Sequence, residues 1–146
     1  MTDALGNTTQ FTYDQSGNLT QQTDTLGNVT NYTYDGNNNK TSQTVTRTLA
    51  DGSTQSLTTQ YQYDGNNHLT RTTLPDGTYT RTEYNSIGKQ SATYDALGHK
   101  TSYDYDANGR LIQTTYADNT SATTTYDAED HRLTYTDRGG HHQLHV

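Results

Sequence analysis

The chain of 146 residues has no cysteine and no tryptophan, and it has only one proline, one phenylalanine and one methionine. Without cysteine there is neither a disulfide framework nor a thiolate that could act as nucleophile or metal ligand. No apolar run approaches the length that spans a bilayer, so the sequence predicts no membrane insertion. The formal net charge of -7 disfavours binding to nucleic acid.

Hydrophobic residues are scarce, at 27% of the chain, and a content this low is typical of disorder. Two features oppose disorder: charged residues make up only 17%, and many of the 13 tyrosines recur at a fixed period. We therefore predict an ordered β array with a thin interior. Tyrosine rings and single leucines, such as Leu19, Leu69, Leu111 and Leu133, are expected to bury most of the apolar surface.

The fixed period is carried by tyrosines that are followed, with one exception, by aspartate. They are separated by 21, 29, 21, 21 and 21 residues and comprise Tyr13, Tyr34, Tyr63, Tyr84, Tyr105 and Tyr126. Outside the long interval, a turn of Gly-Asn type lies 14 residues after each of these tyrosines, and the next tyrosine of the series is due 7 residues later. Such a period indicates a repeat architecture, in which each unit buries its apolar surface against its neighbours.

Each repeat reads as two half-repeats, Tyr-Asp-x-x-Gly-Asn-Leu-Thr and Asp-x-Leu-Gly-Asn-x-Thr-x-Tyr-x-Tyr-Asp. Glycine and asparagine tolerate positive φ and aspartate stabilises turns, whereas the Thr and Tyr between them favour extended strands. Tyr32 and Tyr34, like Tyr103 and Tyr105, are two residues apart and should share one face of a strand. The predicted fold is therefore all-β, an antiparallel β-hairpin repeat ribbon.

The structural repeat positions are Tyr13, Asp14, Gly17, Leu19, Gly27, Tyr32, Tyr34, Asp35, Tyr61, Tyr63, Asp64, Leu69, Gly77, Tyr84, Gly98, Tyr103, Tyr105, Asp106, Gly109, Leu111, Tyr126, Asp127 and Leu133. They extend over residues 1–146, which we interpret as one array of about six to seven repeats of 21 residues. The motif is already in register at Asp3, and the next tyrosine of the series would fall just beyond Val146. We expect a segment truncated at both ends, with strand edges open to self-association.

One interval is longer than the others. Tyr34 to Gly52 spans 18 residues instead of 14, and Gly52 to Tyr63 spans 11 instead of 7. Adding four residues to each arm preserves the alternation of faces, so we predict a longer hairpin at 43–60 with its tip near Gly52. Such a tip could carry a binding function, but tolerated length variation explains it more simply.

These motifs resemble the Rhs or YD-repeat family, which includes bacterial Rhs toxins, the B and C components of Tc toxins, and teneurins. The resemblance implies a β-hairpin ribbon that coils into a hollow shell and, in the toxins, encloses an effector domain. It therefore implies a structural segment of a secreted or cell-surface bacterial protein, without cofactor, whose partners are the remaining repeats and the enclosed effector. The family's Asp-Pro-x-Gly cleavage motif is absent, because the only proline, Pro75, follows Leu74.

The sequence supports a catalytic or metal-binding function less well than a structural role. Asp104, Asp106, Asn108 and Gly109 match the opening of a calcium loop, but the twelfth position is Thr115 instead of glutamate. Asp35, Asn37 and Asn39 fail in the same way. His141, His142 and His145 are expected at ordinary strand positions. No nucleophile elbow or phosphate loop is present, so we predict no enzyme. The alternative is an extracellular adhesive or carbohydrate-binding YD-repeat module.

Overall fold

The computed structural model describes residues 8–144, which form β-strands joined by tight turns and contain no helix. Contacts divide the chain into two compact units, up to Tyr79 and from Thr80 on. The first unit contains β1 (Gln10–Tyr13), β2 (Leu19–Thr23), β3 (Val29–Tyr34), β4 (Lys40–Thr48), β5 (Thr54–Tyr63) and β6 (Leu69–Thr73). The second contains β7 (Tyr79–Tyr84) apart from its first residue, and β8 (Gln90–Tyr94), β9 (Lys100–Tyr105), β10 (Leu111–Thr115), β11 (Ser121–Tyr126), β12 (Arg132–Thr136) and β13 (His142–Leu144).

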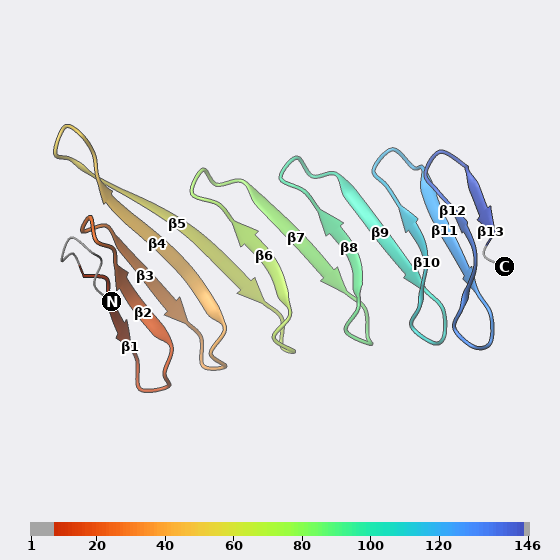
Figure 1. The fold of residues 1–146 in the computed structure, drawn as a ribbon, viewed down its shortest axis with the longest axis horizontal. Coiled ribbons are helices and arrows are strands. Elements are labelled where there is room, and N and C mark those ends of the chain that lie inside the picture. Colours follow the sequence, from red (N-terminus) through yellow and green to blue (C-terminus); the bar gives the residue numbers. More distant parts are fainter. Residues whose placement is uncertain (1–7, 145–146) are drawn as a thin grey trace. The chain divides into compact units, whose positions relative to one another are not determined.

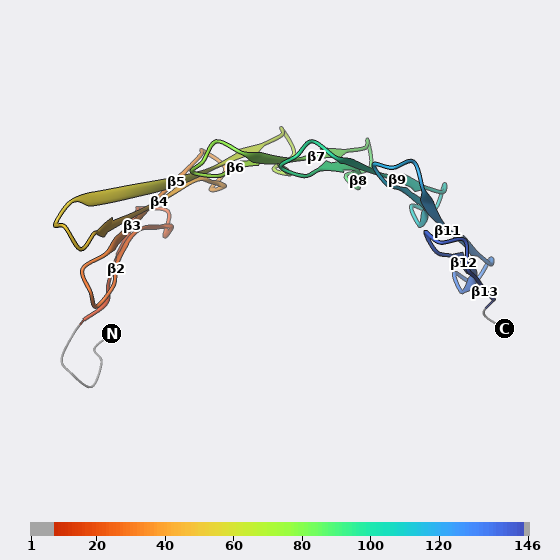
Figure 2. The same cartoon turned by 90° about the horizontal axis from the view of Figure 1, so that it is seen from above.

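Within each unit, every strand pairs antiparallel with the strand that follows it in the chain (Figure 1). The strands of each unit form a single layer, as Figure 2 shows. This confirms the predicted all-β ribbon of antiparallel hairpins. The long interval in the sequence corresponds to β4 and β5, which have 9 and 10 residues where other strands have at most 6. That the array is continuous over 1–146 stays a prediction.

The turns share one five-residue geometry. In the turn 14–18, the N–H of Asp14 donates to the carbonyl of Asn18 (2.9 Å) and the N–H of Gly17 donates to the carbonyl of Asp14 (3.1 Å). The fourth residue has positive φ, the arrangement of a type I turn followed by a left-handed residue. All twelve turns of the described chain repeat this hydrogen-bond pattern, with Gly, Asn or Asp in fourth place.

We call the six periodic tyrosines the Tyr-Asp tyrosines, and a β-bulge follows every turn that begins directly after one of them. Tyr105 pairs with Leu111 and Asp104 with Gln113, so Ile112 is the extra residue. The equivalent extra residues are Thr20, Thr41, Thr70, Ser91 and Leu133. A bulge leaves its extra residue outside the ladder and increases the local twist. The bulges therefore recur at the same place in each of these hairpins.

The pairing register separates two faces. Tyr103 pairs with Thr114 and lies on the same side of β9 as Tyr105, whereas Ser102 and Asp104 lie on the other side. We call the side with the Tyr-Asp tyrosines the tyrosine face and the other the polar face. The polar face carries hydroxyl pairs between neighbouring strands, such as Thr44 with Thr58 at 2.9 Å.

The interior is even thinner than the composition suggests. The fully buried apolar residues of the described chain are Ala92, with 2% of its surface exposed, and Ala122, with 6%. The expectation that leucines do much of the burying is wrong for Leu69, Leu111 and Leu133, which are exposed. A single layer has no second sheet to cover them, and Leu133 is itself a bulge residue. Large side chains are shielded only by their neighbours on the same face.

Candidate functional site

Four Tyr-Asp tyrosines connect each hairpin to the one before it. Their hydroxyls donate to backbone carbonyls: Tyr34 to Leu19 (2.9 Å), Tyr63 to Lys40 (2.9 Å), Tyr105 to Gln90 (2.9 Å) and Tyr126 to Leu111 (3.1 Å). Each acceptor directly precedes the bulge of the preceding Tyr-Asp hairpin. We call these bonds the tyrosine links. Burial raises the pKa of Tyr34, Tyr63 and Tyr105.

The link of Tyr63 shows why the long hairpin is accommodated. Three links join residues 15 apart in sequence, whereas Tyr63 and Lys40 are 23 apart. The additional residues all lie in β4 and β5 beyond the link, towards the turn that begins at Leu49. The insertion therefore lengthens the β4–β5 hairpin without displacing the link, which joins the two strands at the end opposite the turn.

Replacing Tyr34 with phenylalanine should lower the free energy of unfolding by about 1 kcal/mol, because only the hydrogen bond to Leu19 is lost. Tyr32→Phe is the matched control on the same strand and face, where the structure gives the hydroxyl no hydrogen bond. Urea unfolding of the two variants measures the difference. An equal effect of both substitutions would contradict a role for the link.

Aspartate side chains stabilise the turns in two ways. In one class, aspartate is the first turn residue: Asp35 accepts the backbone N–H groups of Asn37 and Asn39 at 2.9 Å, and the side-chain amide of Asn39 at 3.0 Å. In other turns of this class the fifth residue is histidine or arginine. In turn 64–68, for example, His68 Nδ1 lies 3.0 Å from the carboxylate of Asp64. These hydrogen bonds, chiefly that from the Asn39 side chain, lower the pKa of Asp35.

The second class has aspartate in third place. Asp118 accepts both the backbone N–H (3.1 Å) and the hydroxyl (2.6 Å) of Thr120. Asp51 and Asp76 bind Ser53 and Thr78 in the same manner. The sequence analysis missed this class, although its signal, Asp followed by Gly or Asn and then Ser or Thr, is visible in the chain.

Stability should fall in acid because turn carboxylates have lowered pKa values in the folded chain. The Thr120 hydroxyl, with Arg138, lowers the pKa of Asp118, and the Asn39 amide lowers that of Asp35. A lowered folded pKa stabilises the fold above the unfolded pKa, and this contribution is lost as pH falls through the folded value. The urea midpoint should therefore decrease between about pH 4 and pH 2.

The control for this titration is Asp118→Asn, which keeps the side-chain shape and removes one carboxylate. Its stability should depend less on pH in the acid range than that of the parent chain. A parent whose urea midpoint is unchanged across the acid range would contradict the contribution of the turn aspartates.

Cations cover the tyrosine rings. Of nine Lys and Arg residues, all within the described range, eight place their charged group over a tyrosine ring. The shortest separations from a ring centre are 3.7 Å for Arg71 over Tyr79 and 3.9 Å for Arg81 over Tyr94. These contacts shield rings that a single-layer sheet would leave open to water. Sequence reasoning did not anticipate this pairing.

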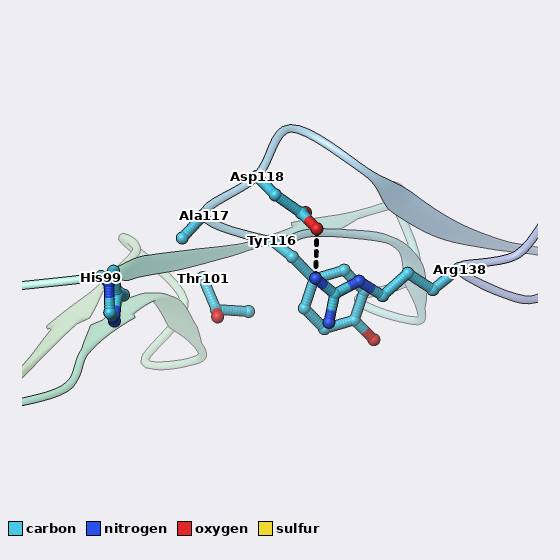
Figure 3. Close-up of a pocket in the computed structure, with 6 residues that line it drawn as sticks. All are labelled: His99, Thr101, Tyr116, Ala117, Asp118 and Arg138. Atoms are coloured by element: carbon cyan, nitrogen blue, oxygen red, sulfur yellow. Dashed lines mark hydrogen bonds and ion pairs between the residues drawn. The ribbon is translucent and has the colours of Figure 1, made fainter.

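A hollow of about 450 Å3 lies at the edge of the second unit (Figure 3). It is lined by His99, Thr101, Tyr116, Ala117, Asp118 and Arg138. The Arg138 guanidinium lies over the Tyr116 ring, 4.6 Å from its centre, and forms an ion pair with Asp118. The hollow therefore offers an aromatic ring, a carboxylate and two nitrogen-bearing side chains. The Arg138 guanidinium, however, already lies over one face of the Tyr116 ring.

The partial calcium motif does not form a calcium loop. Asp104 lies on β9, whereas Asp106 begins the turn 106–110 and is bound by Arg110 Nε at 2.7 Å. Within residues 8–144, no cluster of three histidine or acidic residues could hold a metal ion. In the second partial motif, Asp35, Asn37 and Asn39 belong to one turn whose donors already surround Asp35.

The expectation for His141 is wrong. It is not a strand residue but the fifth residue of the turn 137–141, where its ring Nδ1 lies 3.2 Å from the Asp137 carboxylate. His142 begins β13, and His145 lies outside the described residues. The same Asp–His pairing recurs at His68, His99 and His131, so these histidines belong to the turn repeat.

The sequence profile described as RHS Repeat matches residues 1–27, 13–54, 84–121 and 105–142, which together exceed half of the chain. The chain belongs to the RHS repeat family. A comparison with curated proteins found no match. In the part of the chain that the structure describes, no helix is long and apolar enough to cross a membrane.

Solved Tc toxin structures contain the same fold. The matches include TcdB2-TccC3, its complex with Cdc42, and the Photorhabdus luminescens Tc holotoxin pore with a mutation in TccC3. Each has a TM-score of 0.69 and 20% sequence identity, over 87% of this RHS repeat chain. The chain spans 7% of the length of those proteins, so the similarity concerns the repeat fold.

The predicted repeat residues of this RHS repeat chain occupy a few recurring places. Asp14, Asp35, Asp64, Asp106 and Asp127 begin turns, and Gly17, Gly27, Gly77, Gly98 and Gly109 take fourth place with positive φ. Leu19, Leu69 and Leu111 begin the strands after Tyr-Asp turns. Sequence reasoning missed the non-glycine residues in fourth place, Asn38, Asn67, Asn119 and Asp130. Tyr13 is the most exposed Tyr-Asp tyrosine, at 59%.

Proposed function

We propose that this RHS repeat chain is a structural segment of a β-shell that encloses a toxin or effector domain. The observation that carries the proposal is the single layer of linked hairpins, in which residues that define the repeat serve turns and neighbour contacts. Such a layer can extend by adding hairpins, as a wall requires. The likeness to the Tc toxin structures supports this role.

The partners under this proposal are further repeats of the same shell and an enclosed effector. The segment is part of a larger exported bacterial protein, found outside the cell or at its surface. Its role is not catalytic and needs no cofactor, because the polar side chains of the repeat are engaged in turns, links and cross-strand pairs. Under this proposal, the segment keeps protease away from the enclosed effector.

An exchange experiment tests the wall function. Residues 8–144 replace the matched stretch of TcdB2-TccC3, and the assembled complex is treated with a protease. We expect the exchanged complex to assemble and to resist digestion about as well as the parent complex. A matched control deletes the same stretch without replacing it. Failure of the exchanged complex to assemble, while the isolated chain is folded, would contradict the proposal.

A second candidate is carbohydrate binding, for which the specific observation is the hollow beside Tyr116 (Figure 3). Sugars bind to aromatic rings flanked by polar groups, and the hollow combines such a ring with Asp118 and His99. A glycan array probed with the isolated chain decides between the two functions. Binding that is lost in Tyr116→Ala would favour this candidate, and absence of binding would favour the wall.

A further inference from the structure

Side chains join successive turns along one edge of each unit, the edge formed by the turns that follow Tyr-Asp tyrosines (Figure 1). We call these the Tyr-Asp turns; they comprise 14–18, 35–39, 64–68, 85–89, 106–110 and 127–131. The contacts chiefly join the fifth residue of one turn to the fourth residue of the next, and the third residue Asn37 also donates to Asn67 at 2.9 Å. The repeat motif has Gly in fourth and Asn in fifth place, but several turns of this chain carry other residues at these two places.

The strongest of these contacts joins turns 106–110 and 127–131. Arg110 is the fifth residue of its turn, and its Nη1 lies 2.5 Å from the carboxylate of Asp130, the fourth residue of the next. The same nitrogen donates to the carbonyl of Asp127 at 2.9 Å. Asp130 has a φ of 68°, so its side chain extends from a left-handed position. The contact is a charge-assisted hydrogen bond between neighbouring hairpins.

The same two places carry amides in the first unit. Asn18 Nδ2 donates to Asn38 Oδ1 at 2.8 Å, and Asn39 Nδ2 donates to Asn67 Oδ1 at 2.8 Å. Asn38 and Asn67 are the fourth residues of their turns, with φ values of 64° and 66°. An amide pair therefore occupies the position of the arginine–aspartate pair.

A third combination matches a long side chain with glycine. Lys89 is the fifth residue of turn 85–89, and Gly109 is the fourth residue of the next turn. A Cβ atom on Gly109 would lie 2.9 Å from Lys89 Cε, so the flexible end of the Lys89 side chain would have to move. The absence of a side chain at Gly109 lets the Lys89 side chain extend towards Tyr105, whose ring centre is 5.6 Å from its Nζ.

We propose that the fifth residue of each Tyr-Asp turn and the fourth residue of the next form a pairing code that selects which hairpins lie side by side. Near-identical hairpins present similar backbone ladders, so the ladder by itself discriminates poorly against a neighbour one repeat away. Positive φ restricts the fourth residue to Gly, Asn or Asp, and each choice suits a different fifth residue. The pairs Asn–Asn, Lys–Gly and Arg–Asp are matched: glycine opposite Asn or Arg loses the hydrogen bond, exchanging Asn for one partner of Arg–Asp loses the charge pairing, and a side chain opposite Lys89 forces the lysine to move.

The code is tested in the 146-residue chain by a double-substitution cycle at Arg110 and Asp130. Arg110→Asn and Asp130→Asn each remove the ion pair, whereas the double variant recreates the amide pair of Asn18 and Asn38. Each single variant should speed amide exchange in turn 127–131 about fivefold. The double variant should exchange more slowly than either single variant. Glu129→Gln is the control, because it changes the same charge in the same turn without contacting Arg110.

A second cycle tests the collision. Gly109→Asn should displace the Lys89 side chain from the Tyr105 ring and so modestly speed amide exchange in turn 106–110, because the new Cβ meets the flexible end of Lys89. Adding Lys89→Asn should recover protection, since Asn tolerates the fourth position elsewhere on this edge. If the effects of the two single substitutions on amide exchange are additive in both double variants, the pairing code is wrong. Should a single variant lose its β-sheet circular dichroism altogether, recovery of the spectrum in the double variant supports the code, and failure to recover contradicts it.

Discussion

Replacing Tyr63 with alanine should lower the free energy of unfolding by about 3 kcal/mol, measured by urea denaturation. The substitution removes a half-buried ring at the end of β5 and the hydrogen bond from its hydroxyl to the Lys40 carbonyl. This link joins β5 to β4 at the open end of the long hairpin, and without it only the backbone ladder holds these two strands together there. The raised pKa of Tyr63, caused by burial, reflects the same shielding.

The matched control is Gln62→Ala, one residue earlier on the same strand. Gln62 pairs with Arg71 on the polar face, and its side chain is exposed. We expect its replacement to change the unfolding free energy by no more than about 0.5 kcal/mol. Similar losses at both positions would mean that the tyrosine face contributes no more to stability than the polar face.

Deleting Ile112 should destabilise the second unit by about 3 kcal/mol. Ile112 is the bulge residue of β10, placed between the pairs Tyr105–Leu111 and Asp104–Gln113. Without it, residues from Gln113 onward shift by one position and turn to the opposite face, because side chains alternate along a strand. The five-residue turns at both ends of β10 leave no slack to absorb the shift.

Ile112→Thr is the control for the deletion, because it keeps the length of the strand and changes only the side chain. Threonine occupies the equivalent bulge positions at Thr20, Thr41 and Thr70, so this variant should unfold at nearly the temperature of the parent chain. Thermal unfolding followed by circular dichroism compares the two. A deletion variant as stable as Ile112→Thr would show that register in β10 is not what the bulge maintains.

Several features of the fold were predictable because they are local. Turns at Gly17, Gly27 and Gly98 follow from residues that tolerate positive φ, and the strands between them follow from Thr and Tyr at alternating positions. The even insertion in each arm of β4 and β5 could be recognised by counting residues. Repetition strengthened each inference, since the same local signal recurs many times. The resemblance to the RHS repeat family rested on the same signals.

Other features depend on neighbours that are distant in sequence, and only the tertiary structure decided them. The acceptors of the tyrosine links are backbone carbonyls 15 or 23 residues away, which carry no sequence signature. The expected burial of Leu69, Leu111 and Leu133 was wrong because burial depends on whether a second layer exists, and each unit has one layer. The sequence by itself determined the hairpins and their period through local backbone preferences. The tertiary structure decided how adjacent hairpins are joined. The bulges bring the tyrosine hydroxyls close to backbone carbonyls, and they bring the side chains of one turn close to the next turn.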